Sequence, residues 1–252
     1  MGCRHTRLIR QSLPEADIRV LMREPGRALP EGATGRVATL AEAIAFKPEV
    51  AVIANPATLH LDAAVPLARS GVHLLVEKPL SAHCAGVDAL IETARTSGIV
   101  LLVGYNLRYA PSLQDFSQRV RQGVIGRCLG VRAEVGQYLP SWRPAAAYRQ
   151  GVSARRELGG GVLLELSHEL DYLRWIFGEV RSVQAMVARQ SSLEIDVEDT
   201  ADLLLQFEST GEGTGVVASV HLDFVRRDSI RICTAGSTDC QQRQSLQRFI
   251  PA

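Results

Sequence analysis

The sequence has little of what marks several large classes of proteins. Lys and Arg number 28 and Asp and Glu 27, so the formal net charge of +1 offers no basic field for nucleic acid. No apolar run reaches the roughly 18 residues that a membrane span requires. Residues 1–10 are polar and basic without an apolar segment behind them, which argues against a secretory signal peptide. The composition, 46% hydrophobic and 22% charged, is typical of a globular protein.

Cysteine is scarce and scattered. The five cysteines are odd in number and include no Cys-x-x-Cys pair, which argues against a disulfide framework and against a zinc site. Reduced thiols are the default expectation for such a pattern, and we predict a cytoplasmic protein without a metal site. The cysteines are Cys3, Cys84, Cys128, Cys233 and Cys240.

The first half of the chain alternates short apolar runs with helical patterns. Runs this apolar are typical of strands buried on both faces, and their alternation with helices predicts a parallel, doubly wound sheet. Ser81 stands where the cap of the last of these helices is expected. The predicted strands are 17–22, 49–54, 72–76 and 99–103, and the predicted helices are 40–46, 59–70 and 81–97.

The pattern changes after Pro111. We expect a helix at 112–122 and a strand at 129–135, then a polar loop, the glycine run 159–161 and a helix at 162–177; the remainder, 180–235, has the pattern of antiparallel strands. The sequence therefore predicts an α/β chain of two domains. Residues 1–111 would form the parallel domain, and residues 112–252 an α+β domain with a largely antiparallel sheet.

Polar residues follow three consecutive predicted strands. Ligands of open parallel sheets bind at the carboxyl ends of the strands, so three such groups in a row favour a binding site over ordinary solvated turns. The groups are Asn55, Pro56 and His60 after the strand at 49–54, Glu77 and Lys78 after 72–76, and Asn106 and Arg108 after 99–103.

This ordered set resembles the glucose–fructose oxidoreductase/inositol dehydrogenase (Gfo/Idh/MocA) family. The similarity is carried by the Asn-Pro turn with a His beyond it, by GVHLLVEKPL, by GYNLRYAP and by ELGGGVLLELSHELDYLRWIFG, and it extends over about residues 2–234. The resemblance implies a Rossmann-type domain followed by an α+β domain for substrate binding and oligomerisation. It also implies an NAD(P)-dependent oxidoreductase that moves hydride between the cofactor and a hydroxyl of a sugar, nucleotide sugar or cyclitol.

The resemblance and the chemistry together suggest catalytic roles. Oxidation of an alcohol releases a proton, and the base that takes it needs a pKa near the working pH, which suits His168. Lys78 would hydrogen-bond the reacting oxygen and stabilise the negative charge that develops there. Asp171 and Glu165 lie three residues after and before His168, so the three share one helix face and either carboxylate could orient the imidazole. Where the family often has Asp, four residues before the His, this chain has Leu164.

The same resemblance implies binding residues. The expected cofactor contacts are Gly2, Arg23, Asn55, Pro56, His60, Glu77, Lys78, Asn106 and Arg108. Substrate contacts are expected from the loop before the glycine run, since long loops commonly carry them, although such a loop can also simply pack on the sheet. These substrate-binding candidates are Trp142, Tyr148, Arg149 and Glu165.

Parts of the family pattern are absent at both ends of this sequence. Gly2-Cys3-Arg4-His5 resembles the last glycine of the phosphate-binding fingerprint and the residues after it, without the first strand or the earlier glycines. After Gly236 the apolar periodicity is lost, and we expect strands to be missing there too. A catalytically inactive, truncated relative, acting as a nucleotide-binding regulator or a remnant, therefore stays open as the alternative. A full-length form is expected to be a homo-oligomer, with the antiparallel sheet as the interface.

Arg23 gives a slight preference for NADP over NAD. It follows the strand at 17–22, where a dinucleotide fold reads the adenosine ribose and an arginine can pair with a 2′-phosphate. We expect Arg23→Ala to weaken the binding of NADPH and to leave that of NADH nearly unchanged in fluorescence titrations. Equal losses for both cofactors would show that Arg23 does not read the 2′-phosphate.

Overall fold

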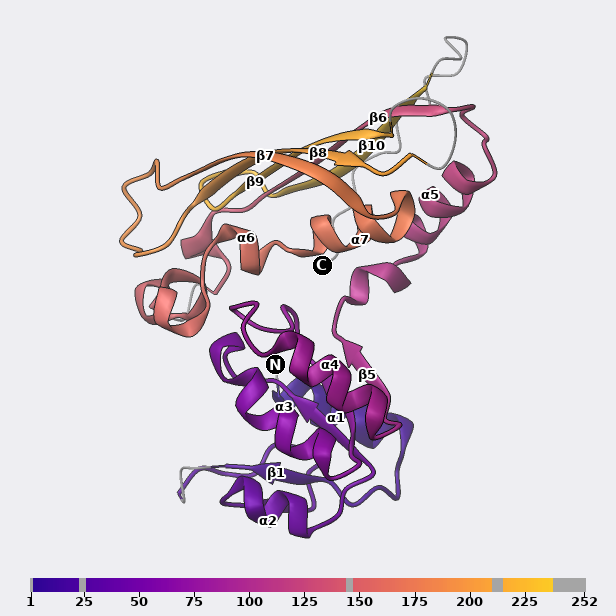
Figure 1. Cartoon of the computed structure of the whole chain (residues 1–252). Coiled ribbons are helices and arrows are strands. Elements are labelled where there is room, and N and C mark those ends of the chain that lie inside the picture. Colours follow the sequence, from indigo (N-terminus) through magenta and orange to yellow (C-terminus); the bar gives the residue numbers. More distant parts are fainter. Residues whose placement is uncertain (1, 23–25, 144–146, 210–214, 238–252) are drawn as a thin grey trace. The chain divides into compact units, whose positions relative to one another are not determined.

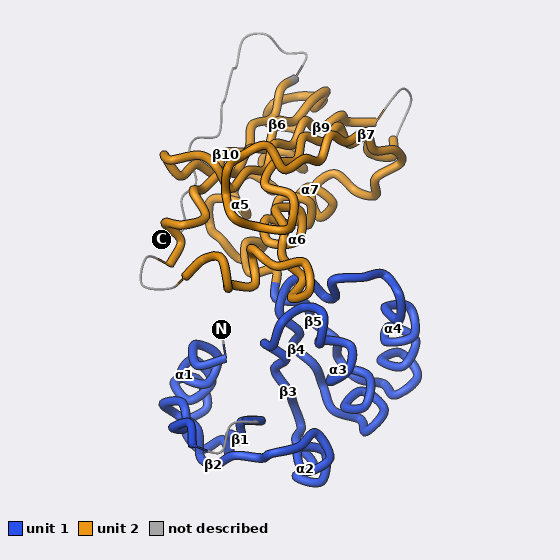
Figure 2. Tube along the Cα trace, turned by 90° about the vertical axis from the view of Figure 1, so that its left-hand side faces the viewer, with its two compact units in different colours: residues 1–104 blue, residues 105–252 orange. Residues whose placement is uncertain are grey.

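The computed structural model describes residues 2–22, 26–143, 147–209 and 215–237. The chain divides into two compact units, Met1–Gly104 and Tyr105–Ala252 (Figures 1 and 2). The sequence prediction had set the boundary between residues 111 and 112. No helix in the described ranges is long and apolar enough to cross a bilayer.

Unit 1 is built around a parallel sheet of order β3-β4-β5, as the sequence predicts for a Rossmann-type fold. The short strands β1 and β2 pair in parallel with each other, and strand pairing within the described residues does not join them to β3-β4-β5 (Figure 2). The strands are β1 (Arg19–Leu21), β2 (Gly35–Val37), β3 (Val50–Ile53), β4 (His73–Val76) and β5 (Leu101–Val103). The helices are α1 (Gly2–Ser12), α2 (Leu40–Ala45), α3 (His60–Arg69) and α4 (Val87–Thr96).

The core of unit 1 lies between β4 and the helices α3 and α4. Leu74 and Val76 of β4 are almost completely buried, as are Ala64 and Ala68, which stand one turn apart on α3. Leu90 of α4 joins the same cluster and is fully buried. Burial of a leucine or valine side chain contributes about 1.5–3 kcal/mol, so this cluster fixes the helices against the sheet.

Two features of unit 1 differ from the sequence prediction. Strand β2 was missed, because it has only three residues. Helix α4 begins at Val87 after Gly86, six residues beyond the predicted start at Ser81. The Ser81 hydroxyl instead accepts a hydrogen bond from the His83 N–H, 3.2 Å away, and such short-range bonds favour a turn over a helix start.

Unit 2 is a five-stranded sheet of order β10-β6-β9-β8-β7 with helices on one face. All neighbouring strands are antiparallel except β6 and β9, so the sheet is mixed but mostly antiparallel, as predicted. The strands are β6 (Cys128–Gly136), β7 (Val180–Ala188), β8 (Thr200–Phe207), β9 (Val217–Asp223) and β10 (Ile230–Ser237). The helices are α5 (Pro111–Arg121), α6 (Val162–Glu165) and α7 (His168–Phe177).

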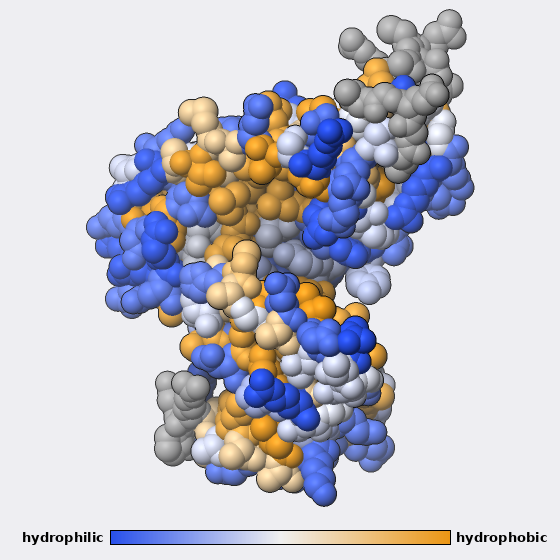
Figure 3. All heavy atoms as spheres, viewed as in Figure 1, coloured by the Kyte–Doolittle hydropathy of each residue, from blue (hydrophilic) through white to orange (hydrophobic). Residues whose placement is uncertain are grey.

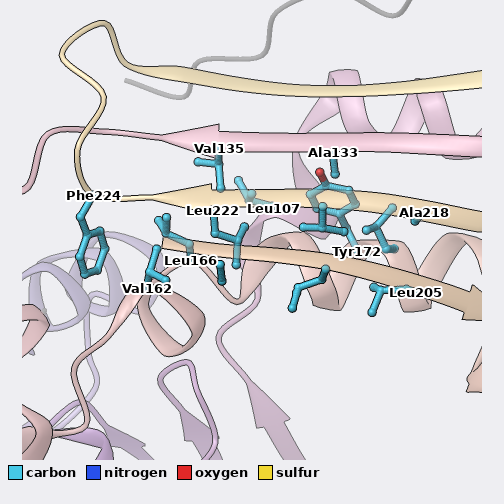
Figure 4. Packing of buried hydrophobic residues seen from close by; sticks show 14 of the residues in the cluster. Leu107, Ala133, Val135, Val162, Leu166, Tyr172, Leu205, Ala218, Leu222 and Phe224 are labelled. Atoms are coloured by element: carbon cyan, nitrogen blue, oxygen red, sulfur yellow. The ribbon is translucent and has the colours of Figure 1, made fainter. Parts of the chain in front are cut away.

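The core of unit 2 is formed by alternate residues of the central strands and by the helices beneath them. Figure 4 shows Ala133, Leu205 and Leu222 of the strands beside Val162 and Tyr172 of the helices, all of them buried. The other face of the sheet leaves apolar side chains uncovered; they include Met186, Leu204 and Val217, which are 71%, 48% and 43% exposed. Figure 3 shows apolar residues among hydrophilic ones on the molecular surface.

The predicted continuous helix over residues 162–177 is wrong. It is broken at Leu166 and Ser167 into α6 and α7. The Ser167 hydroxyl donates to the Leu164 carbonyl at 2.9 Å, a local bond of the kind that competes with helix continuation. Glu165 and His168 therefore stand on different helices and do not share a helix face.

A buried ion pair ties α7 to the edge strand β10. The Glu169 side chain is fully buried, and the Arg231 guanidinium donates to its Oε1 at 2.7 Å. Tyr172 and Cys233 lie in the same region, and burial raises the pKa of the Cys233 thiol to about 12. Because the Glu169 carboxylate has little access to water, it depends on Arg231 as its partner. The ion pair therefore fixes the position of α7 against β10.

We expect Glu169→Ala to lower the free energy of unfolding by about 3–5 kcal/mol, because it leaves the Arg231 charge in a largely buried place without its partner. Urea denaturation of the purified chain measures this. The control is Arg174→Ala on the same helix, which removes an exposed ion pair with Glu179 and should cost about 1 kcal/mol or less. Equal losses in both variants would show that the buried ion pair contributes no more to the free energy of unfolding than the exposed one.

Candidate active site

The carboxyl edge of the β3-β4-β5 sheet brings together Asn55, Glu77 and Lys78. The three strands end level with one another, because the Glu77 N–H donates to Ile53 O and the Gly104 N–H to Val76 O, both at 2.8 Å. Asn55 is exposed and Lys78 is partly exposed. Two of the three predicted groups therefore meet at one edge of unit 1, while Asn106 and Arg108 belong to unit 2.

His60 lies behind this edge and is completely buried. Its Nε2 is 2.9 Å from the Asn55 carbonyl oxygen, and its Nδ1 is 3.0 Å from that of Pro79 and 3.3 Å from that of Leu80. Both ring nitrogens thus face backbone oxygens of the turns that follow β3 and β4. The His60 side chain therefore has no exposed surface in this structure with which to make the predicted direct contact with a cofactor.

Glu77 is also held by the chain itself. Its Oε1 lies 2.5 Å from His5 Nε2, and its Oε2 accepts the Lys78 N–H at 3.3 Å. Its carboxylate packs on Gly104, where a Cβ would lie only 3.2 Å from Oε2. Because His5 is in the first turn of α1, this contact places the helix start, at Gly2, beside the carboxyl edge of the sheet. Helix N-termini are suited to phosphate groups.

In unit 2, His168 is the first residue of α7 and packs on Tyr105. The two rings meet edge to face, with centroids 5.5 Å apart. The Tyr105 hydroxyl donates to the Ser167 Oγ at 3.4 Å, and burial raises the pKa of the Tyr105 phenol. Histidine is a common proton acceptor because its ordinary pKa lies near neutral pH.

Asp171 shares the α7 face with His168, but its oxygens bind Arg108. The guanidinium donates from Nε at 2.8 Å and from Nη2 at 2.5 Å, and the Asp171 hydrogen bond raises the pKa of Arg108. The Asp171 side chain is 10% exposed. Asp171, predicted to assist catalysis, therefore binds Arg108, predicted to contact the cofactor. This ion pair fixes α7 to the 3-10 helix Asn106–Tyr109.

Glu165 and the glycine run hold the loop that precedes α6. The Ser153 hydroxyl donates to Glu165 Oε2 at 2.9 Å. Gly161 has φ +108°, and a side chain there would collide with Glu198, whose Oε1 accepts the Leu163 N–H at 3.2 Å. A Cβ on Gly160 would collide with the Val152 carbonyl oxygen. Gly160 is thus required by close backbone approach, and Gly161 by its positive φ.

The three other substrate-binding candidates are engaged within unit 2. The Trp142 ring meets Phe224 edge to face at 5.2 Å, and its Nε1 donates to Gln137 O at 3.2 Å. Arg149 pairs with Glu194 and lies over the Tyr148 ring. These contacts are those of a loop packed on its own domain, and substrate contact by these residues stays a prediction.

Of the acidic residues between 196 and 202, Asp196 and Asp202 are exposed, whereas Glu198 is half-buried and Asp199 is buried. Asp199 is fully buried and accepts the N–H groups of Gln190 and Ser191 at 2.8 and 2.9 Å. Asp202 pairs with His221 at 2.7 Å. Within the described ranges, no three His, Cys, Asp or Glu side chains are grouped so as to hold a metal ion.

Sequence reasoning missed His5 and Tyr105 as parts of the site. His5 stood in the quoted Gly2-Cys3-Arg4-His5 segment and Tyr105 in GYNLRYAP, so both were within the motifs without a role. Their partners, Glu77 and His168, are 72 and 63 residues away in the sequence, and local patterns carry no information at that range. Arg23 lies outside the described residues.

Two family models match the chain. Residues 4–105 match an oxidoreductase family with an NAD-binding Rossmann fold, and residues 113–238 match the GFO/IDH/MocA C-terminal domain. Among curated relatives, 1,5-anhydro-D-fructose reductase of Ensifer adhaerens is 28% identical, with 78% of this chain and 57% of the relative aligned. Myo-inositol 2-dehydrogenase of Thermotoga maritima is 27% identical, with 66% and 48% aligned. The chain thus spans about half the length of these relatives.

Solved structures agree with this fold. GenD2 from gentamicin A biosynthesis, in complex with NAD, is 25% identical and superposes with a TM-score of 0.80 over 95% of this chain and 67% of its own. Levoglucosan dehydrogenase in complex with NADH, at 22% identity, has a TM-score of 0.82 over 94% and 68%. The second likeness concerns the fold alone.

The raised pKa of Tyr105 predicts a pH dependence of stability. The unfolded phenol loses its proton near pH 10, whereas the folded one keeps it to a higher pH. The stability that this group contributes is therefore complete below about pH 10 and is lost as the pH rises toward the folded pKa. We expect Tyr105→Phe to flatten this alkaline loss in urea unfolding curves. Tyr109→Phe, an exposed neighbour, is the control for removal of a hydroxyl group.

Proposed function

The chain belongs to the GFO/IDH/MocA family of oxidoreductases, and we propose that it transfers a hydride between NAD(P) and a hydroxyl group of a sugar, nucleotide sugar or cyclitol. The observation that carries the proposal is the carboxyl edge of β3-β4-β5, where Asn55 and Lys78 stand together beside the start of α1. This is the edge at which open parallel sheets bind nucleotides.

The residues of unit 1 fit a dinucleotide. Asn55 and Lys78 offer polar groups at the sheet edge, and the backbone N–H groups at the start of α1, near Gly2, suit a phosphate. The NAD complex of GenD2 supports NAD(H) as the cofactor class. The preference for NADP rests on Arg23 in the sequence. Asn106, exposed at the start of its 3-10 turn, is the candidate contact from unit 2.

The bound nicotinamide would supply the hydride acceptor, and the chain would manage the proton and the charge. His168 accepts the hydroxyl proton, which is the task of a general base. Lys78 donates a hydrogen bond to the oxygen that gains negative charge. Asp171 has a positioning role, because its bond to Arg108 fixes the helix that carries His168. Trp142, Tyr148, Arg149 and Glu165 shape the loop on the substrate side.

Two further parts of the proposal concern the protein in the cell. The uncovered apolar side chains on the open face of the five-stranded sheet favour a homo-oligomer, since such patches mark contact surfaces. Size-exclusion chromatography with light scattering measures the oligomeric state.

The scattered cysteines favour a cytoplasmic location, because Cys3 and Cys84 are exposed free thiols.

We expect Lys78→Ala and His168→Ala each to lower kcat/KM by about a hundredfold or more, the usual scale for loss of acid–base or oxyanion support. The assay follows NAD(P)H absorbance with a panel of sugars, nucleotide sugars and cyclitols. Binding of the cofactor should survive His168→Ala, since the role of His168 is in the substrate half. The control is His83→Ala, an exposed histidine with no role in the site.

Near-normal turnover in both variants would contradict the assignment of these residues. Tight cofactor binding without turnover of any substrate in the panel would instead favour the inactive, nucleotide-binding alternative.

A further inference from the structure

His60 connects two turns that the sheet itself does not join. The turn after β3 carries Asn55, and the turn after β4 carries Lys78. The backbone ladder between the two strands ends with the bond from the Glu77 N–H to Ile53 O. Beyond that point, the His60 ring spans the gap, with Nε2 at 2.9 Å from Asn55 O and Nδ1 at 3.0 Å from Pro79 O.

A carbonyl oxygen only accepts, so a ring nitrogen of His60 donates to it only where that nitrogen carries a hydrogen: one contact is a hydrogen bond in the neutral ring, and both are in the doubly protonated ring. Burial holds both contacts in place. The side chain is completely inaccessible, so neither ring nitrogen can exchange its backbone partner for water. Loss of a buried hydrogen bond leaves a polar group unsatisfied, which costs more than the loss of an exposed one. The ring is also placed firmly, because His60 is the first residue of α3, whose Ala64 and Ala68 are packed in the core.

We propose that His60 is a positioning residue of the cofactor site: its imidazole clamps the Asn55 turn to the Lys78–Leu80 turn and so fixes the spacing of Asn55 and Lys78. His60 acts through these two residues and does not itself touch the cofactor. The cofactor part of this inference rests on the proposed function, whereas the clamp between the two turns does not depend on it.

The clamp has two arms, the contact of Nε2 with Asn55 O and the contact of Nδ1 with Pro79 O, and substitutions can remove them one at a time. The amide nitrogen of an asparagine stands close to where Nδ1 of a histidine lies, and that of a glutamine close to Nε2, and both donate hydrogen bonds. His60→Asn should therefore keep the arm to Pro79 O and lose the arm to Asn55 O. His60→Gln should do the reverse, and His60→Ala should lose both.

Hydrogen exchange followed by mass spectrometry tests the clamp without any ligand. In His60→Ala, peptides covering residues 54–59 and 77–82 should both exchange faster, by about tenfold, because the ring that contacts both turns is lost. In His60→Asn the acceleration should be confined to 54–59, and in His60→Gln to 77–82. Unchanged exchange in both peptides of His60→Ala would overturn the proposal.

His73→Ala is the matched control. His73 begins β4 at the opposite end of the same sheet, and its Nδ1 accepts the Val100 N–H at 2.9 Å, so this variant also removes a histidine–backbone bond. It should leave the exchange of both turn peptides unchanged. Acceleration equal to that in His60→Ala would reveal general loosening of the sheet and would overturn the specific role of His60.

Titration with NADH and NADPH, followed by fluorescence, tests the link to the cofactor. We expect His60→Ala to raise Kd by about tenfold, with partial recovery in His60→Asn or His60→Gln, and His73→Ala to bind as the unchanged chain does. Faster exchange with an unaltered Kd would overturn the positioning role. Failure of the unchanged chain to bind either dinucleotide would overturn the proposed function and the cofactor part of the inference, while the exchange data would still decide whether the clamp exists.

Discussion

Parallel pairing of β3, β4 and β5 is the constraint on which the organisation of unit 1 depends. Since parallel strands end at one edge, residues that follow Ile53 and Val76 are brought together although their positions in the sequence are well separated. The buried side chains of β4 and α3 keep this edge rigid. His60 and Glu77 are buried behind this edge, and their contacts with the backbone hold the turns that follow β3 and β4.

Charged side chains fix the position of α7 in unit 2. Asp171 binds Arg108 on one side of the helix, and the buried Glu169 binds Arg231 of β10. A helix held at two points by charge-assisted hydrogen bonds has little freedom to rotate. The first residue of that helix is His168, so the same ion pairs that stabilise the domain also set the direction of the proposed proton acceptor.

Several acidic residues of unit 2 serve as acceptors for backbone N–H groups. Glu198 binds the N–H of Leu163 at the start of α6, and Asp199 binds those of Gln190 and Ser191. Such contacts satisfy donors that loops would otherwise leave buried and unpaired. One of them also limits the glycine run, because Glu198 occupies the space that a side chain at Gly161 would need.

The amino-acid sequence by itself determined the fold class, the order of most elements and the family, because apolar periodicity and the short motifs are local signals. Only the tertiary structure decided which side chains are partners. Asp171 was expected to orient His168 and binds Arg108, 63 residues away; Glu165 was expected on the His168 helix and binds Ser153. Neither outcome could be predicted, since a hydrogen bond between distant residues depends on how the helices break and pack, and the local pattern does not encode that.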